Sequence, residues 1–82
     1  MSVSGKHVVV TGGGSGVGAA CAQLFASRGA MVTIFGRTKE KLAAQSLPYR
    51  VCDVTDPEAV AAACHEARDE AGPIDAVIAN AG

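Results

Sequence analysis

Four short apolar runs alternate along the chain with segments of helical pattern. Residues 7–11 are apolar without alternation, which is typical of a strand buried on both faces. Residues 31–35 and 75–79 have a similar character, and residues 49–53 form a weaker run. We therefore expect four strands in these places.

The segment after the first strand has the spacing of an amphipathic helix. Its larger apolar residues fall at i, i+3, i+4, i+7 and i+8, and they are Val17, Ala20, Cys21, Leu24 and Phe25. We expect this stripe to face the sheet.

Two further helices are expected, one over residues 39–45 and one beginning at Asp56-Pro57-Glu58. Asp56 can accept a hydrogen bond from a free N–H at the helix start, and Pro57 suits the first helical position. An acid in the first turn suits the positive end of the helix dipole. The apolar face of this helix comprises Val60, Ala63, Cys64, Ala67 and Ala71.

The resulting order, β-α-β-α-β-α-β, predicts an α/β fold with parallel strands and right-handed crossovers. The length of 82 residues permits one domain. A net charge of −1 without a basic block argues against nucleic acid and anionic membranes as partners. The apolar runs are too short for a membrane span, and residues 1–7 lack a signal-peptide core, so we expect a cytoplasmic location.

The three cysteines, Cys21, Cys52 and Cys64, have no CxxC spacing. A disulfide framework or a zinc site needs paired or clustered ligands. We expect buried free thiols that pack as small apolar groups, and no metal site.

The Gly-rich run over residues 11–18 lies between the first strand and the first helix. Glycines let the backbone turn tightly and approach phosphates closely, and a helix N-terminus presents free N–H groups to an anion. The run therefore predicts a cradle for a nucleotide pyrophosphate. A P-loop is excluded, because Ala19 and Ala20 stand where it needs Lys and Ser or Thr.

The run fits two dinucleotide-binding patterns. Gly14-x-Gly16-x-x-Ala19 matches the general fingerprint. The better match is TGxxxGxG, formed by Thr11, Gly12, Gly16 and Gly18, and with it the sequence resembles the short-chain dehydrogenase/reductase family.

Two later stretches strengthen the resemblance. Asp53-Val54 follows the third strand, where the family uses an Asp beside the adenine ring, and Asn80-Ala81-Gly82 resembles the end of its NNAG signature. Ala79 replaces the first Asn of that signature. The main role expected for Asn80 is to support the sheet, and its second role is to lie beside the cofactor.

The resemblance implies a Rossmann-like sheet of strand order 3-2-1-4, truncated relative to the family. Residues 1–82 would then form a partial dinucleotide-binding domain, with the fourth strand as an uncovered edge. The expected cofactor-binding residues are Thr11, Gly12, Gly14, Ser15, Gly16, Val17, Gly18, Arg37, Asp53, Val54, Asn80, Ala81 and Gly82.

The residues after the second strand indicate which dinucleotide binds. NAD sites usually place an acid there to bind the ribose 2′-hydroxyl. Here Arg37 and Thr38 follow the strand, and no acid occurs before Glu40. An Arg can donate two hydrogen bonds to a 2′-phosphate, so we predict NADP(H) over NAD(H). The alternative is that Arg37 is a solvated surface cation. In addition, NADP-preferring members often carry a basic residue where this chain has Ser15.

The family's catalytic Tyr-x-x-x-Lys has no match in this chain. Its single tyrosine, Tyr49, is followed four residues later by Asp53, which would raise the pKa of the phenol. His7 and His65 form no Ser-His-acid set. We therefore assign no catalytic residue and expect a partial chain.

Three functions stay open at this point. The first is the NADP(H)-binding part of an oxidoreductase acting on an alcohol/carbonyl pair, which would be a homo-oligomer at full length. The second is a non-catalytic dinucleotide-binding module, either a natural truncation or an engineered fragment. The third is an interaction protein that reuses the fold with a vacant cradle.

Overall fold

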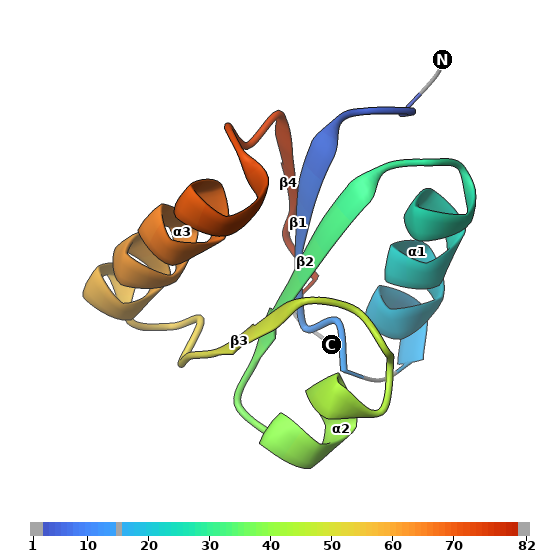
Figure 1. The fold of residues 1–82 in the computed structure, drawn as a ribbon. Helices are drawn as coiled ribbons and strands as arrows, with labels where there is room; N and C mark the ends of the chain where they lie inside the picture. Colours follow the sequence, from blue (N-terminus) through green and yellow to red (C-terminus); the bar gives the residue numbers. More distant parts are fainter. Residues whose placement is uncertain (1–2, 15, 81–82) are drawn as a thin grey trace.

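The computed structural model describes residues 3–14 and 16–80, which form one twisted sheet with helices on both faces (Figure 1). The elements in chain order are β1 (His7–Thr11), α1 (Gly16–Ser27), β2 (Met31–Gly36), α2 (Lys39–Ala43), β3 (Tyr49–Val51), α3 (Pro57–Ala71) and β4 (Ala76–Ile78).

The sheet has the order β3-β2-β1-β4, and every pair of neighbouring strands is parallel. This confirms the Rossmann-like α/β fold expected from the sequence. Because the strands are parallel, their carboxyl ends meet at one edge, where Thr11, Gly36, Val51 and Ile78 are the last strand residues. Ligands of open α/β sheets bind at this edge.

The strands β3 and β4 are shorter than the runs that predicted them, 49–53 and 75–79. At β3 the cause is a local turn. The Cys52 N–H still donates to the Gly36 carbonyl at 2.8 Å, but the Asp53 carboxylate then accepts from the Thr55 N–H at 2.9 Å. Such an Asx turn redirects the chain and ends the strand.

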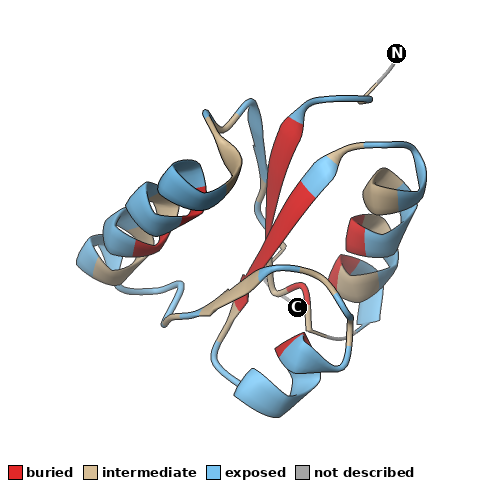
Figure 2. Cartoon of the chain, in the orientation of Figure 1, coloured by how far each residue is buried: buried red, intermediate tan, exposed pale blue. Residues whose placement is uncertain are grey.

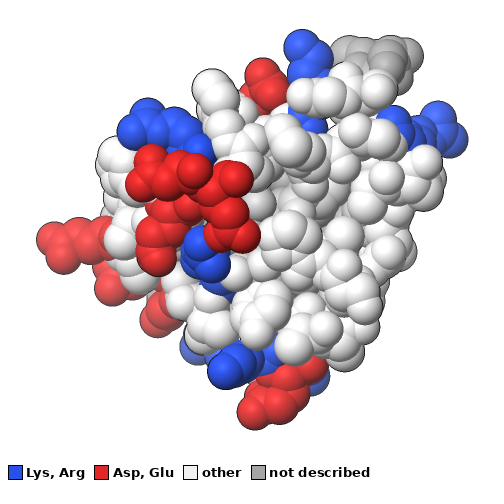
Figure 3. Space-filling view, in the orientation of Figure 1, with Lys and Arg blue, Asp and Glu red and all other residues white. Residues whose placement is uncertain are grey.

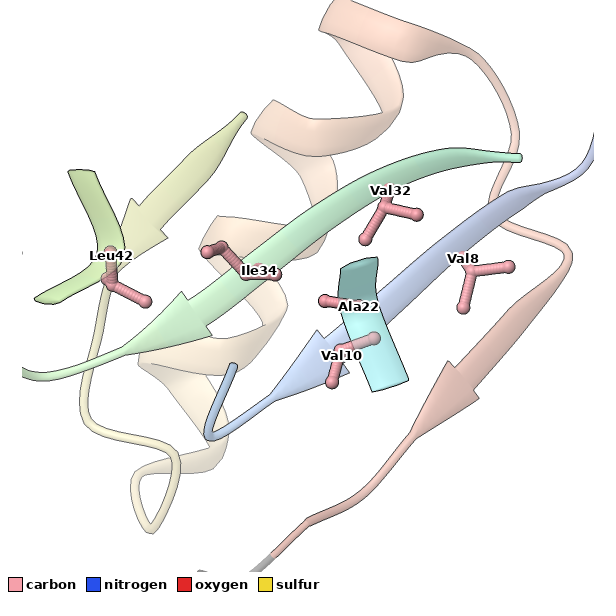
Figure 4. Packing of buried hydrophobic residues seen from close by; sticks show 6 residues of the cluster. All are labelled: Val8, Val10, Ala22, Val32, Ile34 and Leu42. Atoms are coloured by element: carbon pink, nitrogen blue, oxygen red, sulfur yellow. The ribbon is translucent and has the colours of Figure 1, made fainter. Parts of the chain in front are cut away.

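The core has two parts, one on each face of the sheet. Buried residues lie along β1 and β2 and on the inner sides of the helices (Figure 2). On the face covered by α1 and α2, the buried cluster comprises Val8, Val10, Ala22, Val32, Ile34 and Leu42 (Figure 4). On the α3 face it comprises Val9, Phe35, Ala63 and Ala67. Successive residues of β1 and β2 thus serve opposite faces, as continuous apolar strands require.

The apolar stripe predicted for α1 is confirmed only in part. Phe25 packs against the buried cluster on this face, but Val17 and Leu24 are 72% and 52% exposed. The buried residues of the helix are Gly18 and Ala22, and these small residues let the α1 backbone approach the sheet closely. The spacing predicted the helix correctly, whereas the short distance between helix and sheet selects small residues for its inner side.

The helix α3 begins and packs as the sequence predicts. The Asp56 carboxylate accepts from the Glu58 N–H at 3.0 Å, and Pro57 is the first helical residue. Its acidic side chains gather on the outer surface (Figure 3). Arg50 of β3 reaches this surface, where it forms an ion pair with Glu70.

Within residues 3–14 and 16–80, the structure contains no helix with the length and apolarity needed to cross a membrane.

The side chain of His7 is buried, with 1% of its surface exposed, and it joins three elements. Its Nδ1 lies 2.9 Å from the Gly72 carbonyl, and its Nε2 lies 2.9 Å from the Thr33 hydroxyl. A carbonyl can only accept, so Nδ1 carries the hydrogen, and in the neutral ring Nε2 accepts from Thr33. The His7 ring therefore ties β1 to β2 and to the end of α3.

Replacing His7 with Leu should lower the free energy of unfolding by about 1–3 kcal/mol, because the buried Thr33 hydroxyl loses its partner. The double variant His7→Leu/Thr33→Val should cost less than the sum of the two single changes, since it leaves no unpaired hydroxyl. Urea denaturation of the four proteins measures this coupling. Strictly additive changes would show that the two side chains act independently.

Candidate functional site

A groove of 360 Å³ lies at the edge of the sheet where the strands end. Ligand pockets usually measure about 300–1,000 Å³, so the groove could hold part of a dinucleotide. Its walls come from the glycine loop, from the ends of β2, β3 and β4, and from α2. The lining residues are Gly12, Gly14, Gly36, Arg37, Thr38, Lys41, Leu42, Asp53, Val54, Thr55 and Asn80.

Three glycines of the loop are packed against the protein itself. A Cβ on Gly18 would lie 2.1 Å from the Gly12 carbonyl oxygen, and one on Gly12 would lie 2.6 Å from the Asn80 carbonyl oxygen. A Cβ on Gly13 would lie 2.6 Å from the Ile34 side chain. These positions need glycine because the loop, α1 and the end of β4 meet without room for a methyl group.

Gly16 differs from these three, because it faces open space. It has a φ of +61°, and among the described residues no atom outside its chain neighbours and its own helix backbone lies within 4 Å of the position a Cβ would take. It begins α1, whose first N–H groups have no carbonyl of a preceding turn to bind. Such N–H groups at an open, glycine-rich helix start are suited to an anionic group. The exposed Val17 follows directly.

Thr11 and Asn80 connect the ends of β1 and β4. The Thr11 hydroxyl donates to the Ile78 carbonyl at 3.4 Å and accepts from the Asn80 N–H at 3.0 Å. The Asn80 side chain lies at 3.5 Å from the Gly12 carbonyl, toward which its amide donates. Asn80 therefore supports the sheet edge, and it also lines the groove.

Asp53 presents a carboxylate at the β3 side of the groove. Its Oδ1 accepts from the Thr55 N–H at 2.9 Å and from the Thr55 hydroxyl at 2.6 Å. These two hydrogen bonds lower the pKa of Asp53, and the nearby Arg37 guanidinium lowers it further. The carboxylate therefore stays ionised, and its Oδ2 faces no donor among the described residues. Val54 lies beside it in the lining.

Arg37 and Thr38 form the turn after β2 and line the groove from that side. Arg37 is exposed and makes no ion pair within 4 Å in the described part of the chain. Thr38 is the N-cap of α2, yet its side chain makes no capping hydrogen bond. Both polar groups are thus free to bind a ligand.

The groove brings together six of the residues expected from the sequence, which are Gly12, Gly14, Arg37, Asp53, Val54 and Asn80. Four more of the expected residues do not line the groove. Thr11 is the last residue of β1, and Gly16, Val17 and Gly18 are the first residues of α1. Ser15, Ala81 and Gly82 were also expected in the site, and they lie outside the described residues.

Besides Gly36, the last residue of β2, the sequence analysis missed four participants, namely Lys41, Leu42, Gln45 and Thr55. Thr55 could have been found, because Asp-x-Thr is a typical Asx-turn spacing. The other three belong to α2 or its end, and nothing local to that segment indicates that it lies against the glycine loop.

Cys52 lies next to the site, and its surroundings favour the protonated thiol. Burial raises the pKa of its thiol, and the nearby Cys64, Asp53 and Glu66 raise it further. All three cysteines are free and partly buried. A second depression, of 450 Å³, lies along α3 and the segment before β4, away from the carboxyl ends of the strands.

Changing Gly18 to Ala should lower the free energy of unfolding by about 1–3 kcal/mol, since the added methyl overlaps the Gly12 carbonyl. Ala20→Ser is the matched control, because it adds one atom on the exposed side of the same helix and should change stability by no more than about 0.5 kcal/mol. Chemical denaturation measures both. Equal stability of the Gly18→Ala protein and the wild type would contradict the close packing of the loop.

Changing Thr55 to Ala should raise the pKa of Asp53 toward the ordinary aspartate value, whereas Thr55→Ser should leave it lowered. Carboxyl-carbon NMR titration measures this. Because the folded-state pKa is lowered, the Thr55 hydrogen bonds stabilise the fold above about pH 4, and this contribution is lost as the pH falls through the lowered pKa. An unchanged Asp53 pKa in Thr55→Ala would show that the Thr55 hydroxyl does not control its ionisation.

Comparisons with known proteins identify the family of the chain. Residues 6–82 match the family model described as short chain dehydrogenase. The chain is 42% identical to a glycine betaine reductase of Emericella nidulans, over 98% of this chain and 7% of that protein. It is 40% identical to a 3-dehydrosphinganine reductase of Arabidopsis thaliana, over 94% of this chain and 25% of that protein.

A solved structure gives the same result in three dimensions. The citronellol catabolism dehydrogenase of Pseudomonas aeruginosa superimposes with a TM-score of 0.85 at 32% identity, covering 90% of this chain and 35% of that one. The chain thus spans a third or less of the curated relatives named above. The glycine loop, the parallel sheet and the family match over residues 6–82 lead to one conclusion: the chain belongs to the short-chain dehydrogenase family.

Proposed function

We propose that this chain binds NADP(H) in preference to NAD(H), as the cofactor-binding part of an oxidoreductase that acts on an alcohol/carbonyl pair. The family membership and the groove support the binding of a nicotinamide dinucleotide. The names of the two relatives, both reductases, support the class of reaction.

The preference for the phosphorylated cofactor rests on the turn after β2. Arg37 and Thr38 line the groove there, and Asp53 is the single acid in the described lining. An acid at the end of β2 would bind the ribose 2′-hydroxyl and repel a 2′-phosphate. An Arg at this place can instead donate two charge-assisted hydrogen bonds to the phosphate.

Other parts of the groove suit the remaining groups of the cofactor. The open start of α1 at Gly16 suits the pyrophosphate. The free Oδ2 of Asp53 can accept from an adenine amino group, while the exposed Val54 offers apolar surface to its ring. When bound, the nicotinamide supplies hydride transfer, and this chain's residues hold the cofactor and orient it.

Proton transfer is not assigned to any residue of this chain. Tyr49 is the first residue of β3 and packs against the core on the α1 and α2 face. A binding module without chemistry is therefore the alternative, and the reaction of the whole protein is a proposal drawn from its family. Homo-oligomer formation and a cytoplasmic location stay predictions from the sequence.

Changing Arg37 to Gln should weaken NADPH binding by about tenfold or more, because a charge-assisted hydrogen bond contributes about 1.5–3 kcal/mol. Binding of NADH should change little. Titration of nicotinamide fluorescence with both cofactors measures this.

Lys39→Gln is the control for this experiment, since Lys39 is exposed on α2 and is absent from the groove lining. It removes one positive charge at nearly the same place in the chain and should leave both affinities unchanged. A wild-type protein that binds NADH as tightly as NADPH would refute the proposed preference.

A further inference from the structure

The groove contains a second cation that the sequence did not reveal. Lys41 lies on α2, lines the groove together with Arg37 and Thr38, and is exposed. Arg37 belongs to the turn between β2 and α2, and both cations line the same groove. The described residues offer it no carboxylate within ion-pair distance.

The backbone at Lys41 is held against the glycine loop. A Cβ on Gly14 would lie 3.2 Å from the Lys41 Cβ, so the two segments touch. Just beyond α2, the Gln45 side chain donates to the Gly14 carbonyl at 3.2 Å. The Gln23 side chain of α1 in turn donates to the Gln45 carbonyl at 2.7 Å. The contact of Lys41 with Gly14 and the hydrogen bonds of Gln45 thus hold this part of α2 against the glycine loop.

The charges in this end of the groove favour an anion. Arg37 and Lys41 both line the groove, and neither has a carboxylate within ion-pair distance among the described residues, so together they attract an anion. The Thr38 side chain lies between them in sequence and makes no capping hydrogen bond. Asp53, the acidic residue of the lining, is in the segment after β3, and Thr55 occupies its Oδ1.

Both signs of charge appear on the surface around α2 (Figure 3), but they are not all part of the groove. Glu40 and Lys39 are exposed and are absent from the lining. Of the four charged residues between positions 37 and 41, the two that line the groove are both cations. Residues 37–41 thus carry both signs of charge, but they contribute only positive charges to the groove.

We propose that Lys41 is a specificity-determining residue that binds the ribose 2′-phosphate together with Arg37 and Thr38. This inference rests on the proposed function, because it assigns a further residue to the NADP(H) site. Arg37 supplies directional hydrogen bonds, and Lys41 supplies a compact charge from the side of the glycine loop. Two cations also balance a phosphate that carries between one and two negative charges near neutral pH.

The test compares the binding of adenosine 2′,5′-bisphosphate and adenosine 5′-monophosphate by calorimetry, because the two probes differ by the 2′-phosphate alone. Lys41→Gln should weaken binding of the bisphosphate by about fivefold, as expected for one solvent-accessible ion pair, and leave the monophosphate unchanged. Lys41→Arg should restore most of the affinity. Lys39→Gln is the matched control and should change neither.

The outcomes separate this inference from the proposed function. If Arg37→Gln weakens the bisphosphate while Lys41→Gln does not, Lys41 is no part of the phosphate site and the NADP(H) proposal stands. If Lys41→Gln weakens both probes equally, its role is structural and the inference is refuted. If the wild type binds both probes equally, the NADP(H) preference itself fails.

Discussion

Gly18 lies so close to the Gly12 carbonyl oxygen that a single methyl group would separate α1 from the sheet, since its Cβ would stand 2.1 Å from that atom. The same Cβ would meet the Asn80 amide at 2.5 Å. The glycine-rich turn, the start of α1 and the distant Asn80 after β4 therefore pack against one another without room for a side chain. Their close packing places the start of α1 at the ends of β1 and β4, and the geometry of the whole groove follows from it.

The parallel sheet then gathers chemically different groups at one edge. Arg37 follows β2, Asp53 follows β3 and Asn80 follows β4. All three therefore lie at the carboxyl edge of the sheet, where they line the same groove. In a parallel sheet every crossover returns the chain to the opposite edge before the next strand begins. The carboxyl edge thus collects the turns that follow the strands, which is why residues far apart in sequence line one groove.

The groove carries both signs of charge for local reasons. At β3, Thr55 holds the Asp53 carboxylate in its ionised form and leaves one oxygen free. At β2, the turn and α2 contribute Arg37 and Lys41. A ligand that offers both a hydrogen-bond donor and an anionic group matches these residues, and the proposed NADP(H) has such groups in its adenine and its 2′-phosphate.

The sequence by itself determined the order of elements, the parallel sheet and the glycine-rich turn between β1 and α1. These depend on local signals, such as the continuous apolar run of β1, the glycine spacing, and the Asp56-Pro57 helix start. It also identified Arg37 and Asp53, because residues that follow strands in this fold reach the ligand edge. Their location depends on chain order, which the sequence displays directly.

The tertiary structure alone decided which side of α1 faces the sheet and which residues of α2 reach the groove. Spacing showed a stripe containing Val17 and Leu24, but the small residue Gly18 is buried, because the distance between helix and sheet selects side-chain volume. Likewise, no local pattern distinguishes the two lysines of α2, Lys39 and Lys41. Lys41 lines the groove because its part of α2 contacts the glycine loop. Both outcomes depend on distances between segments that are remote in the chain, and no local pattern encodes such distances.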